Sequence, residues 1–287
     1  MAPRHLALMI FICVIWGYNF VAAKVGVREL PPLLFTGLRF SIIALVLLPF
    51  LKPAPGRMRD IFIIAMFNGA VHFGLMFIGI ALAAASVVAV VAQLNVPFAT
   101  LLSIVLLGEV VRLRRWVGIA LTILGVTIVS FDPHVFDELT GVLFAAGAAL
   151  SGAIASVRMR SLTGVGMFQL QAWTAIITAP LLLIASALFE HDQWRHIQTA
   201  APITWAALLF TTIGASLIGH NAYYYLLQRY EVSLVAPLSL ISPILGVVFG
   251  ISMLGEPLSL RILLGALIAF GGVAVLALPG RRPRKAR

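Results

Sequence analysis

Residues 103–126 read SIVLLGEVVRLRRWVGIALTILGV, and residues 250–273 read GISMLGEPLSLRILLGALIAFGGV, so one pattern occurs twice, 147 residues apart. Over the longer windows 86–129 and 233–276, 12 of 44 aligned positions are identical without a gap. Leu and Val match by chance in apolar sequences, but both copies also share a Leu-Gly-Glu triplet, an Arg five residues after the Glu and a Gly four residues further on. The pattern predicts that the chain is built from two copies of one unit.

The composition around this repeat is that of a membrane protein. Of the 287 residues, 61% are apolar and only 10% are charged, and the mean hydropathy is +1.07. A soluble domain is about 45–50% apolar and about 25% charged. A bilayer-crossing helix needs about 20 mostly apolar residues, so the chain has room for about ten such helices. These values exclude a soluble enzyme, a disordered chain, a disulfide scaffold and a collagen.

Apolar segments separated by charge clusters predict an all-α polytopic membrane protein with ten transmembrane helices. The division at 82–85 depends on length, because residues 61–107 are about twice as long as one span needs. The predicted segments are 6–25, 32–51, 61–82, 85–107, 115–131, 140–157, 167–189, 203–227, 232–254 and 260–279.

Charges segregate between the two sides of this arrangement. The net charge of +10 would suggest nucleic acid binding in a soluble protein, but here the cations lie in short clusters between apolar segments, so no nucleic acid partner is expected. Fifteen cations fall on the side that holds both termini and four on the other, which carries seven of the ten acids. Cytoplasmic loops collect Lys and Arg. Both termini are therefore predicted to be cytoplasmic, and the basic tail 281–287 is expected to contact anionic lipid.

The repeat also predicts an inverted topology. Each unit, residues 1–133 and 134–280, contains five segments, and an odd number makes the second unit enter the membrane from the opposite side. Glu109 is then predicted to face the cytoplasm and Glu256 the exterior. Inverted repeats that enclose a site near the membrane midplane are typical of secondary transporters. We expect two five-helix inverted repeats around a central cavity, for which a monomer is sufficient and a dimer stays open.

Two histidines occupy matching places in the third and eighth segments, His72 and His220. On a regular helix Ser216, His220 and Tyr224 share one face, and a polar stripe on a membrane helix faces protein or water rather than lipid. Two interpretations stay open. The stripe forms hydrogen bonds between helices, or it lines a solvated substrate cavity in which a histidine takes up protons near neutral pH.

Helix-breaking and charged residues mark further candidate positions. Pro97 and Pro243 lie mid-segment. Each removes a backbone donor and so frees a carbonyl about one turn earlier from its helical hydrogen bond. They predict either packing kinks or flexible breaks beside the substrate path. Arg39 lies inside a segment, where it either binds a carboxylate in a cavity or extends to an interface. Gly246 and Gly250 form a G-x-x-x-G pattern, which is typical of close helix packing.

Several motifs together resemble the EamA-type carriers of the drug/metabolite transporter superfamily. Four stretches of this chain resemble the N-terminal part of those carriers: WGYNFV at residues 16–21, KVG at 24–26, PPL at 31–33 and GLRF at 37–40. Gly108-Glu109 and Gly255-Glu256, each followed by a glycine-rich last segment, match the duplicated EamA unit. The stretches RYE at 229–231 and VAPLSL at 235–240, with Pro243, are similar to the cysteine and O-acetylserine exporter group.

The resemblance covers essentially the whole chain and implies a secondary transporter of the inner membrane. The superfamily includes bacterial exporters of aromatic amino acids, of threonine and homoserine, and of cysteine derivatives. We therefore expect export of amino acids and related metabolites, with broad specificity that includes aromatic amino acids, by alternating access of the two repeats. Substrate binding is expected from Trp16, Asn19, His72, Gln93, His220 and Tyr224, with helix breaks at Pro97 and Pro243 and with Arg39 as a carboxylate partner.

Missing motifs limit the other possibilities. The sequence has no G-x-x-x-x-G-K-[ST], H-E-x-x-H or C-x-x-C pattern, so no cofactor or metal is expected, and no extramembrane segment is long enough to bind ATP. A carrier of a sugar, a drug or another small metabolite on the same architecture stays open. An intramembrane enzyme acting on lipid-linked substrates, with His72 or His220 as base, is the alternative from a different class.

Overall fold

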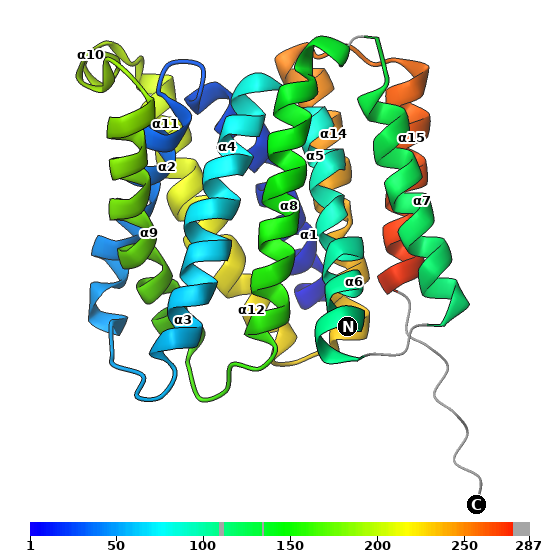
Figure 1. Ribbon diagram of the computed structural model, residues 1–287, viewed down its shortest axis with the longest axis horizontal. Helices are drawn as coiled ribbons and strands as arrows, with labels where there is room; N and C mark the ends of the chain where they lie inside the picture. The colour runs from blue at the N-terminus through cyan, green and yellow to red at the C-terminus, as the bar shows by residue number, and fades with distance from the viewer. Residues whose placement is uncertain (109–111, 134, 278–287) are drawn as a thin grey trace, which may run out of the picture.

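Ten membrane-length helices stand side by side in the structure, and every regular element among the described residues is helical (Figure 1). The computed structural model describes residues 1–108, 112–133 and 135–277. The predicted position of Glu109 and the basic tail 281–287 lie outside that part. The ten spans confirm the number and order of the predicted segments. They are Pro3–Gly26, Pro32–Phe50, Met58–Leu82, Ala85–Leu106, Leu113–Ser130, Phe136–Met159, Met167–Phe189, Pro202–Leu227, Pro237–Leu254 and Leu260–Ala277, numbered here as spans 1 to 10.

Spans 3, 4, 8 and 9 are interrupted in their interior, whereas the other spans are continuous α-helices. The continuous helices are α1 (Pro3–Gly26), α2 (Pro32–Leu47, followed by η1, Leu48–Phe50), α7 (Leu113–Ser130), α8 (Leu139–Met159, preceded by η4, Phe136–Glu138), α9 (Met167–Phe189) and α15 (Leu260–Ala277). Span 3 consists of α3 (Met58–Ile64), η2 (Ala65–Val71) and α4 (His72–Leu82), and span 4 of α5 (Ala85–Val91), η3 (Ala92–Leu94) and α6 (Asn95–Leu107). Span 8 consists of α11 (Pro202–Leu209), η5 (Phe210–Gly219) and α12 (His220–Leu227), and α10 (Gln193–Thr199) connects spans 7 and 8. Span 9 begins within α13 (Val232–Ser239) and continues through α14 (Ile241–Leu254).

Local sequence explains where many of these helices begin and end. Pro3, Pro32 and Pro202 occupy the first turn of α1, α2 and α11, where a missing N–H has no intrahelical partner to lose. Gly108 and Gly255 end α6 and α14 with φ of 65° and 68°, a left-handed conformation that glycine adopts without steric cost. The Gly of the repeated Leu-Gly-Glu triplet therefore ends a helix in both units.

The two ends of the bundle carry opposite charge. Connections at one end, here the acidic end, carry Glu29, Asp132, Glu138, Glu190 and Glu256; the other end, here the basic end, carries Lys52, Arg57, Arg115, Arg158 and Arg160. The ion pair between Arg158 and Asp60, with 2.5 Å between Nη2 and Oδ1, lies at the basic end. By the distribution of cations, the basic end is predicted to face the cytoplasm.

The contacts between spans follow a two-fold relation between the units. Spans 2 and 7, spans 4 and 9, and spans 5 and 10 each pack against their own counterpart (α2 against α9, α5 against α14, α7 against α15). The pairing of span 3 with span 6 has its equivalent in the pairing of span 8 with span 1, and span 9 on span 1 corresponds to span 4 on span 6. This pattern is that of two five-helix units in inverted orientation.

Repeated glycines hold α7 against α15, which lie together at one side of the bundle (Figure 1). A Cβ on Gly118 would come within 2.9 Å of the carbonyl oxygen of Gly272, and one on Gly265 within 2.7 Å of that of Gly125. The repeated glycines therefore face each other in crossed pairs, Gly118 against Gly272 and Gly125 against Gly265. Backbones approach this closely only where side chains are absent.

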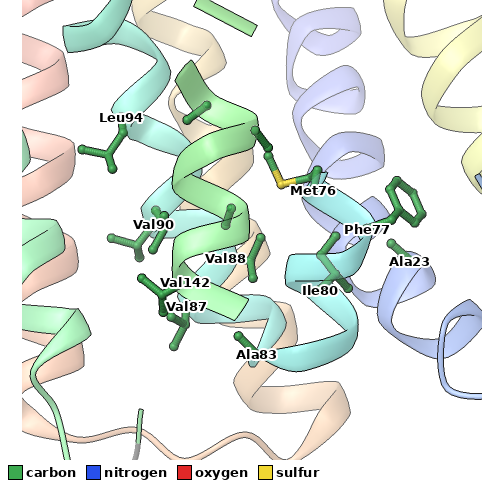
Figure 2. Close-up of a cluster of buried hydrophobic side chains, with 14 of the residues drawn as sticks. Ala23, Met76, Phe77, Ile80, Ala83, Val87, Val88, Val90, Leu94 and Val142 are labelled. Atoms are coloured by element: carbon green, nitrogen blue, oxygen red, sulfur yellow. The ribbon is translucent and has the colours of Figure 1, made fainter. Parts of the chain in front are cut away.

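The half of the bundle nearer the acidic end is filled by apolar side chains. Figure 2 shows Ala23, Phe77, Ile80, Val88 and Val142 among the side chains that α1, α4, α5 and α8 direct toward one another. All five of these side chains are buried. The bundle is therefore closed on this side of its middle.

Candidate functional site: a cavity between two broken helices

Spans 4 and 9 are interrupted at equivalent places. In span 4 the short 3-10 turn η3 separates α5 from α6, and in span 9 a turn at Leu240 separates α13 from α14. Pro97 and Pro243 are each the third residue of the helix that follows the interruption. Because proline has no N–H, each removes the donor that would bond to the carbonyl four residues earlier, which belongs to Gln93 or Ser239.

A cavity of about 570 Å³ extends from these two interruptions to the basic end of the bundle. Its volume falls within the range of about 300–1,000 Å³ that small-molecule sites occupy. The lining residues come from spans 1, 4, 5, 6, 9 and 10, and therefore from both units. They are Trp16, Phe20, Gln93, Asn95, Val96, Ala99, Thr100, Ser103, Arg115, Arg160, Ser239, Leu240, Ser242, Pro243, Val273, Leu276 and Ala277.

The polar groups that line the cavity change from neutral to positively charged along its length. Near the interruptions they are neutral: Asn95 donates from Nδ2 to the carbonyl of Ala149 at 3.1 Å, and Gln93 donates from Nε2 to that of Ala89 at 3.3 Å. Arg115 and Arg160 line the cavity nearer the basic end, and the lining residues include no Asp or Glu. The arrangement offers neutral dipoles in the middle of the membrane and positive charge where the cavity meets the basic end.

Trp16 forms an aromatic wall on the side of span 1. Its indole Nε1 donates to the carbonyl of Ala215 at 3.1 Å, which fixes the ring. The rings of His220 and Tyr223 each lie 5.2 Å from it, centroid to centroid, and Phe20 lines the cavity beside it. An aromatic surface of this kind can contact an apolar or aromatic group of a bound molecule.

Three of the residues expected at the site, namely Trp16, Gln93 and Pro243, line this cavity. Thr100, Ser103, Arg115 and Arg160 also line it and were not expected there. Asn95, Ala99 and Ser103 recur at i, i+4 and i+8, a helical spacing that could have indicated the face of α6 turned toward the cavity. The expected residues outside the lining are Asn19, Arg39, His72, Pro97, His220 and Tyr224.

Arg39 is buried inside the protein, with 2% of its side chain exposed, so it does not extend to an interface. Its Nε and Nη2 donate to Ser216 Oγ at 3.2 Å and 2.7 Å, and its Cζ lies 4.7 Å from the Phe73 ring centre and 5.4 Å from that of Phe77. Within the described part of the chain, Nη1 has no hydrogen-bond partner. Aromatic faces and one hydroxyl therefore surround this cation.

Spans 3 and 8 each contain a π-helix, η2 or η5, which ends immediately before His72 or His220. A π-helix pairs residues five apart and is often found at functional sites. Side chains of other spans donate to carbonyls in both π-helices. The donors are Thr178 to Ala65 at 3.3 Å, Ser151 to Phe67 at 2.6 Å, Trp16 to Ala215 at 3.1 Å and Gln171 to Ser216 at 3.2 Å.

The polar residues of span 8 differ in their exposure. Ser216 is buried, His220 is exposed and Tyr224 is half-buried, and the expectation that these three residues share one face stays a prediction. Nδ1 of His220 lies 2.9 Å from the carbonyl oxygen of Ala215, and Nδ1 of His72 lies 2.7 Å from that of Ala148. Because a carbonyl only accepts, each Nδ1 carries the proton.

Carboxylates bind the starts of helices all along the acidic end. Each of them lies in one unit and accepts hydrogen bonds from the start of a span, or the residue just before it, in the other unit, where backbone N–H groups lack helical partners. No motif in the sequence predicts these contacts. They are Glu29 with Ala201 N (2.7 Å) and Thr204 Oγ1 (2.6 Å), Glu138 with Ala84 N (2.7 Å), Glu190 with Leu33 N (2.7 Å) and Leu34 N (3.0 Å), and Glu256 with Ala85 N (2.6 Å) and Ser86 N (2.9 Å).

Lys24 closes the same end from the opposite helix terminus. Its Nζ donates to the carbonyls of Ile80, Ala81 and Ala83 at 2.7, 3.3 and 2.8 Å. A cation at the C-terminal end of α4 satisfies carbonyls that have no partner in the helix. The acidic end is thus closed by polar contacts above the apolar side chains, while the cavity meets the basic end.

Comparison with known proteins relates this chain to a family of transporters. The model of the EamA-like transporter family matches residues 4–131 and 139–278, one match in each unit. A "Probable amino-acid metabolite efflux pump" of Escherichia coli K12 is 29% identical over 301 residues, covering 100% of this chain and 98% of that protein. The protein of the same name from Salmonella typhimurium is 28% identical over 297 residues, covering 100% and 99%.

A solved structure supports the fold over almost the whole length. It is entitled "Crystal structure of protein", superposes with a TM-score of 0.63 at 21% identity, and covers 96% of both chains. The family matches take in most of the sequence and coincide with the two inverted five-helix units. The protein is a multi-pass membrane protein that belongs to the EamA-like transporter family.

Proposed function

We propose that this protein exports amino acids and related metabolites from the cytoplasm across the inner membrane, by alternating access of its two units. The observation that carries the proposal is the cavity of about 570 Å³, which starts at two broken helices and meets the basic end, while the acidic end is packed shut. Discontinuous helices at a repeat interface are typical of substrate sites in secondary transporters. The name of the Escherichia coli relative, an efflux pump for amino-acid metabolites, supports this substrate class.

The cavity suits a zwitterion better than a highly charged solute. Neutral donors and acceptors at Gln93, Asn95 and Ser242 surround its inner part, and Arg115 and Arg160 add positive charge nearer the basic end. The carboxylate of an amino acid is attracted by that charge as it enters. Trp16 and Phe20 offer a surface for an apolar or aromatic side chain, which supports a broad specificity that includes aromatic amino acids.

The remaining expected residues act, in this proposal, in a second conformation. Arg39 and Asn19 have buried polar atoms without a partner among the described residues, Nη1 and Oδ1. His72, His220 and Tyr224 lie in the two spans that contain the π-helices. We propose that rocking of the two units about Pro97 and Pro243 brings these side chains to the substrate, and that Arg39 then binds its carboxylate.

Transport in proteoliposomes tests the proposal. Vesicles that contain the purified protein are loaded with one radiolabelled amino acid at a time, including phenylalanine, cysteine and threonine, and efflux is compared with that from protein-free vesicles. Protein-dependent efflux of several amino acids is expected, and unlabelled substrate on the opposite side should accelerate it through exchange. Absence of protein-dependent flux for every amino acid, together with flux of a sugar or drug, would overturn the proposal.

A further inference from the structure

Glu256 makes the contact that joins spans 4 and 9 at the acidic end. Its Oε1 accepts from Ala85 N at 2.6 Å and its Oε2 from Ser86 N at 2.9 Å, so one carboxylate of the second unit binds the first residues of α5 in the first unit. Charge-assisted hydrogen bonds of this kind are stronger than neutral ones. The helix dipole adds to them, because it places positive potential at the start of α5.

The sequence of α14 is adapted to this contact. A Cβ on Gly250 would lie 2.5 Å from Glu256 Oε2 and 3.1 Å from Ser86 N, and one on Gly246 would lie 3.2 Å from the Cβ of Ala89. The two glycines of the G-x-x-x-G pattern therefore let α14 approach α5 closely enough for the carboxylate to reach it. Lys24, which holds the end of α4, also interacts electrostatically with Glu256 and with Glu138.

The Glu256 contact and the cavity lie on opposite sides of the interruptions in spans 4 and 9, which relates the contact to the opening and closing of the protein. Spans 4 and 9 enclose the cavity on the basic-end side of their interruptions and touch each other on the acidic-end side. A rocking motion that closes the cavity must separate α5 from the end of α14. The hydrogen bonds of Glu256 lie across that line of separation.

We propose that Glu256 is a latch, whose carboxylate holds the acidic end closed and whose release from Ala85 and Ser86 permits that end to open. The inference rests on the proposed alternating-access function, which it deepens by naming the contact that favours the state with the cavity at the basic end. Glu190 provides a matched comparison. It accepts from Leu33 N and Leu34 N with nearly the same geometry, but it joins spans 2 and 7, neither of which lines the cavity.

Spin-label distances measure the latch directly. Labels are attached at Leu82→Cys, the last residue of α4 and three residues before α5, and at Leu258→Cys, just after α14, in a Cys13→Ser background. The two leucines are 48% and 52% exposed. Distances are recorded in lipid nanodiscs without substrate by pulsed electron paramagnetic resonance. In the Glu256→Gln variant we expect a longer-distance population, with the ratio of open to closed molecules raised about ten-fold or more, since each lost charge-assisted bond is worth at least that factor.

Three further variants decide between a latch and a purely structural cap. Gly250→Ala should shift the distances in the same direction as Glu256→Gln, because its Cβ displaces the carboxylate, and it serves if the first variant fails to fold. Glu190→Gln and Gly271→Ala, whose added Cβ meets nothing within 4 Å, should leave the parent distribution unchanged. Unchanged distances in both Glu256→Gln and Gly250→Ala, or an equal shift in Glu190→Gln, would overturn the latch. The distances are read without substrate, so their outcome is independent of whether amino acid flux is found.

Discussion

At the scale of single residues, the cavity joins side chains that the sequence could indicate with others that it could not. Trp16, Gln93 and Pro243 stand out in the sequence because polar, aromatic and helix-breaking residues are unusual inside apolar spans. In the sequence, Arg160 resembles the other loop cations that indicate which side of the membrane is cytoplasmic. Its place in the cavity follows from packing between spans 4, 5, 6 and 10, which no local pattern specifies.

Trp16→Ala should weaken transport of aromatic amino acids more than transport of small ones. Loss of one aromatic contact is expected to raise the KM for phenylalanine about 3- to 10-fold, with little change for alanine. The measurement is initial efflux from proteoliposomes at several substrate concentrations. Trp16→Phe, which keeps an aromatic ring but loses the hydrogen bond to the carbonyl of Ala215, is the control for the shape of the aromatic wall. An equal rise in KM for both substrates would show that Trp16 does not contact the substrate side chain.

Glu29 should give the protein an acid-sensitive contribution to stability. Hydrogen bonds from Thr204 Oγ1 and Ala201 N hold the pKa of this carboxyl below its ordinary value. Because the folded-state pKa is lowered, the contribution is present above the unfolded pKa and is lost as the pH falls through the folded pKa. Thermal unfolding in detergent from pH 7 to pH 3 should therefore show a smaller acid-induced decrease in Tm for Glu29→Gln than for the parent. Parallel curves for the two proteins would contradict this role.

At the scale of elements, span number, order and approximate limits follow from hydropathy, and the interior geometry of spans 3 and 8 does not. A sequence pattern assumes a regular α-helix, whereas η2 and η5 are π-helices whose carbonyls bond to side chains of other spans. Those partners are distant in sequence. The π-helices themselves could not be predicted for this reason, while the G-x-x-x-G pattern in span 9 correctly indicated close packing, because it depends only on side-chain size.

Thr178→Val should destabilise the π-helix of span 3. The change keeps the side-chain volume but removes the donor to the carbonyl of Ala65, and we expect a loss of about 1 kcal/mol. Thr122→Val is the matched control, because Thr122 is fully buried like Thr178 and its hydroxyl donates to the carbonyl of Gly118 one turn earlier in its own helix. Melting temperatures in detergent compare the two variants, and equal melting temperatures would argue against the cross-span bond as a support of η2.

Gly118→Ala should loosen the packing of α7 on α15. The new methyl group would lie 2.8 Å from Leu276 Cγ and 2.9 Å from the carbonyl oxygen of Gly272, and overpacking of this kind costs about 1–3 kcal/mol. Gly271→Ala, on the open side of α15, should be neutral or slightly stabilising, because alanine favours the helix. Thermal unfolding of both variants tests this, and a Gly118→Ala protein as stable as the parent would show that the two helices can separate without loss.

At the scale of the whole molecule, duplication and inversion are readable from the sequence, but the conformation is not. Twelve identities over 44 positions and an odd number of spans per unit predict the two-fold arrangement, which the paired contacts of spans 2 and 7 and of spans 5 and 10 display. Which end is open depends on small differences between two packings of the same helices. Contacts such as that of Glu256 with α5 decide it, and they join residues far apart in the chain.

The side of the membrane from which the cavity can be reached tests the proposed transport arrangement most directly. Thr100→Cys, which lines the cavity, and Leu258→Cys, at the acidic end, are prepared separately in a Cys13→Ser background and treated with a membrane-impermeant thiol reagent from either face of oriented vesicles. Thr100→Cys should react from the cytoplasmic face, a transported amino acid should slow this reaction, and Leu258→Cys should react from the opposite face. Reaction of both cysteines from the same face would contradict this arrangement.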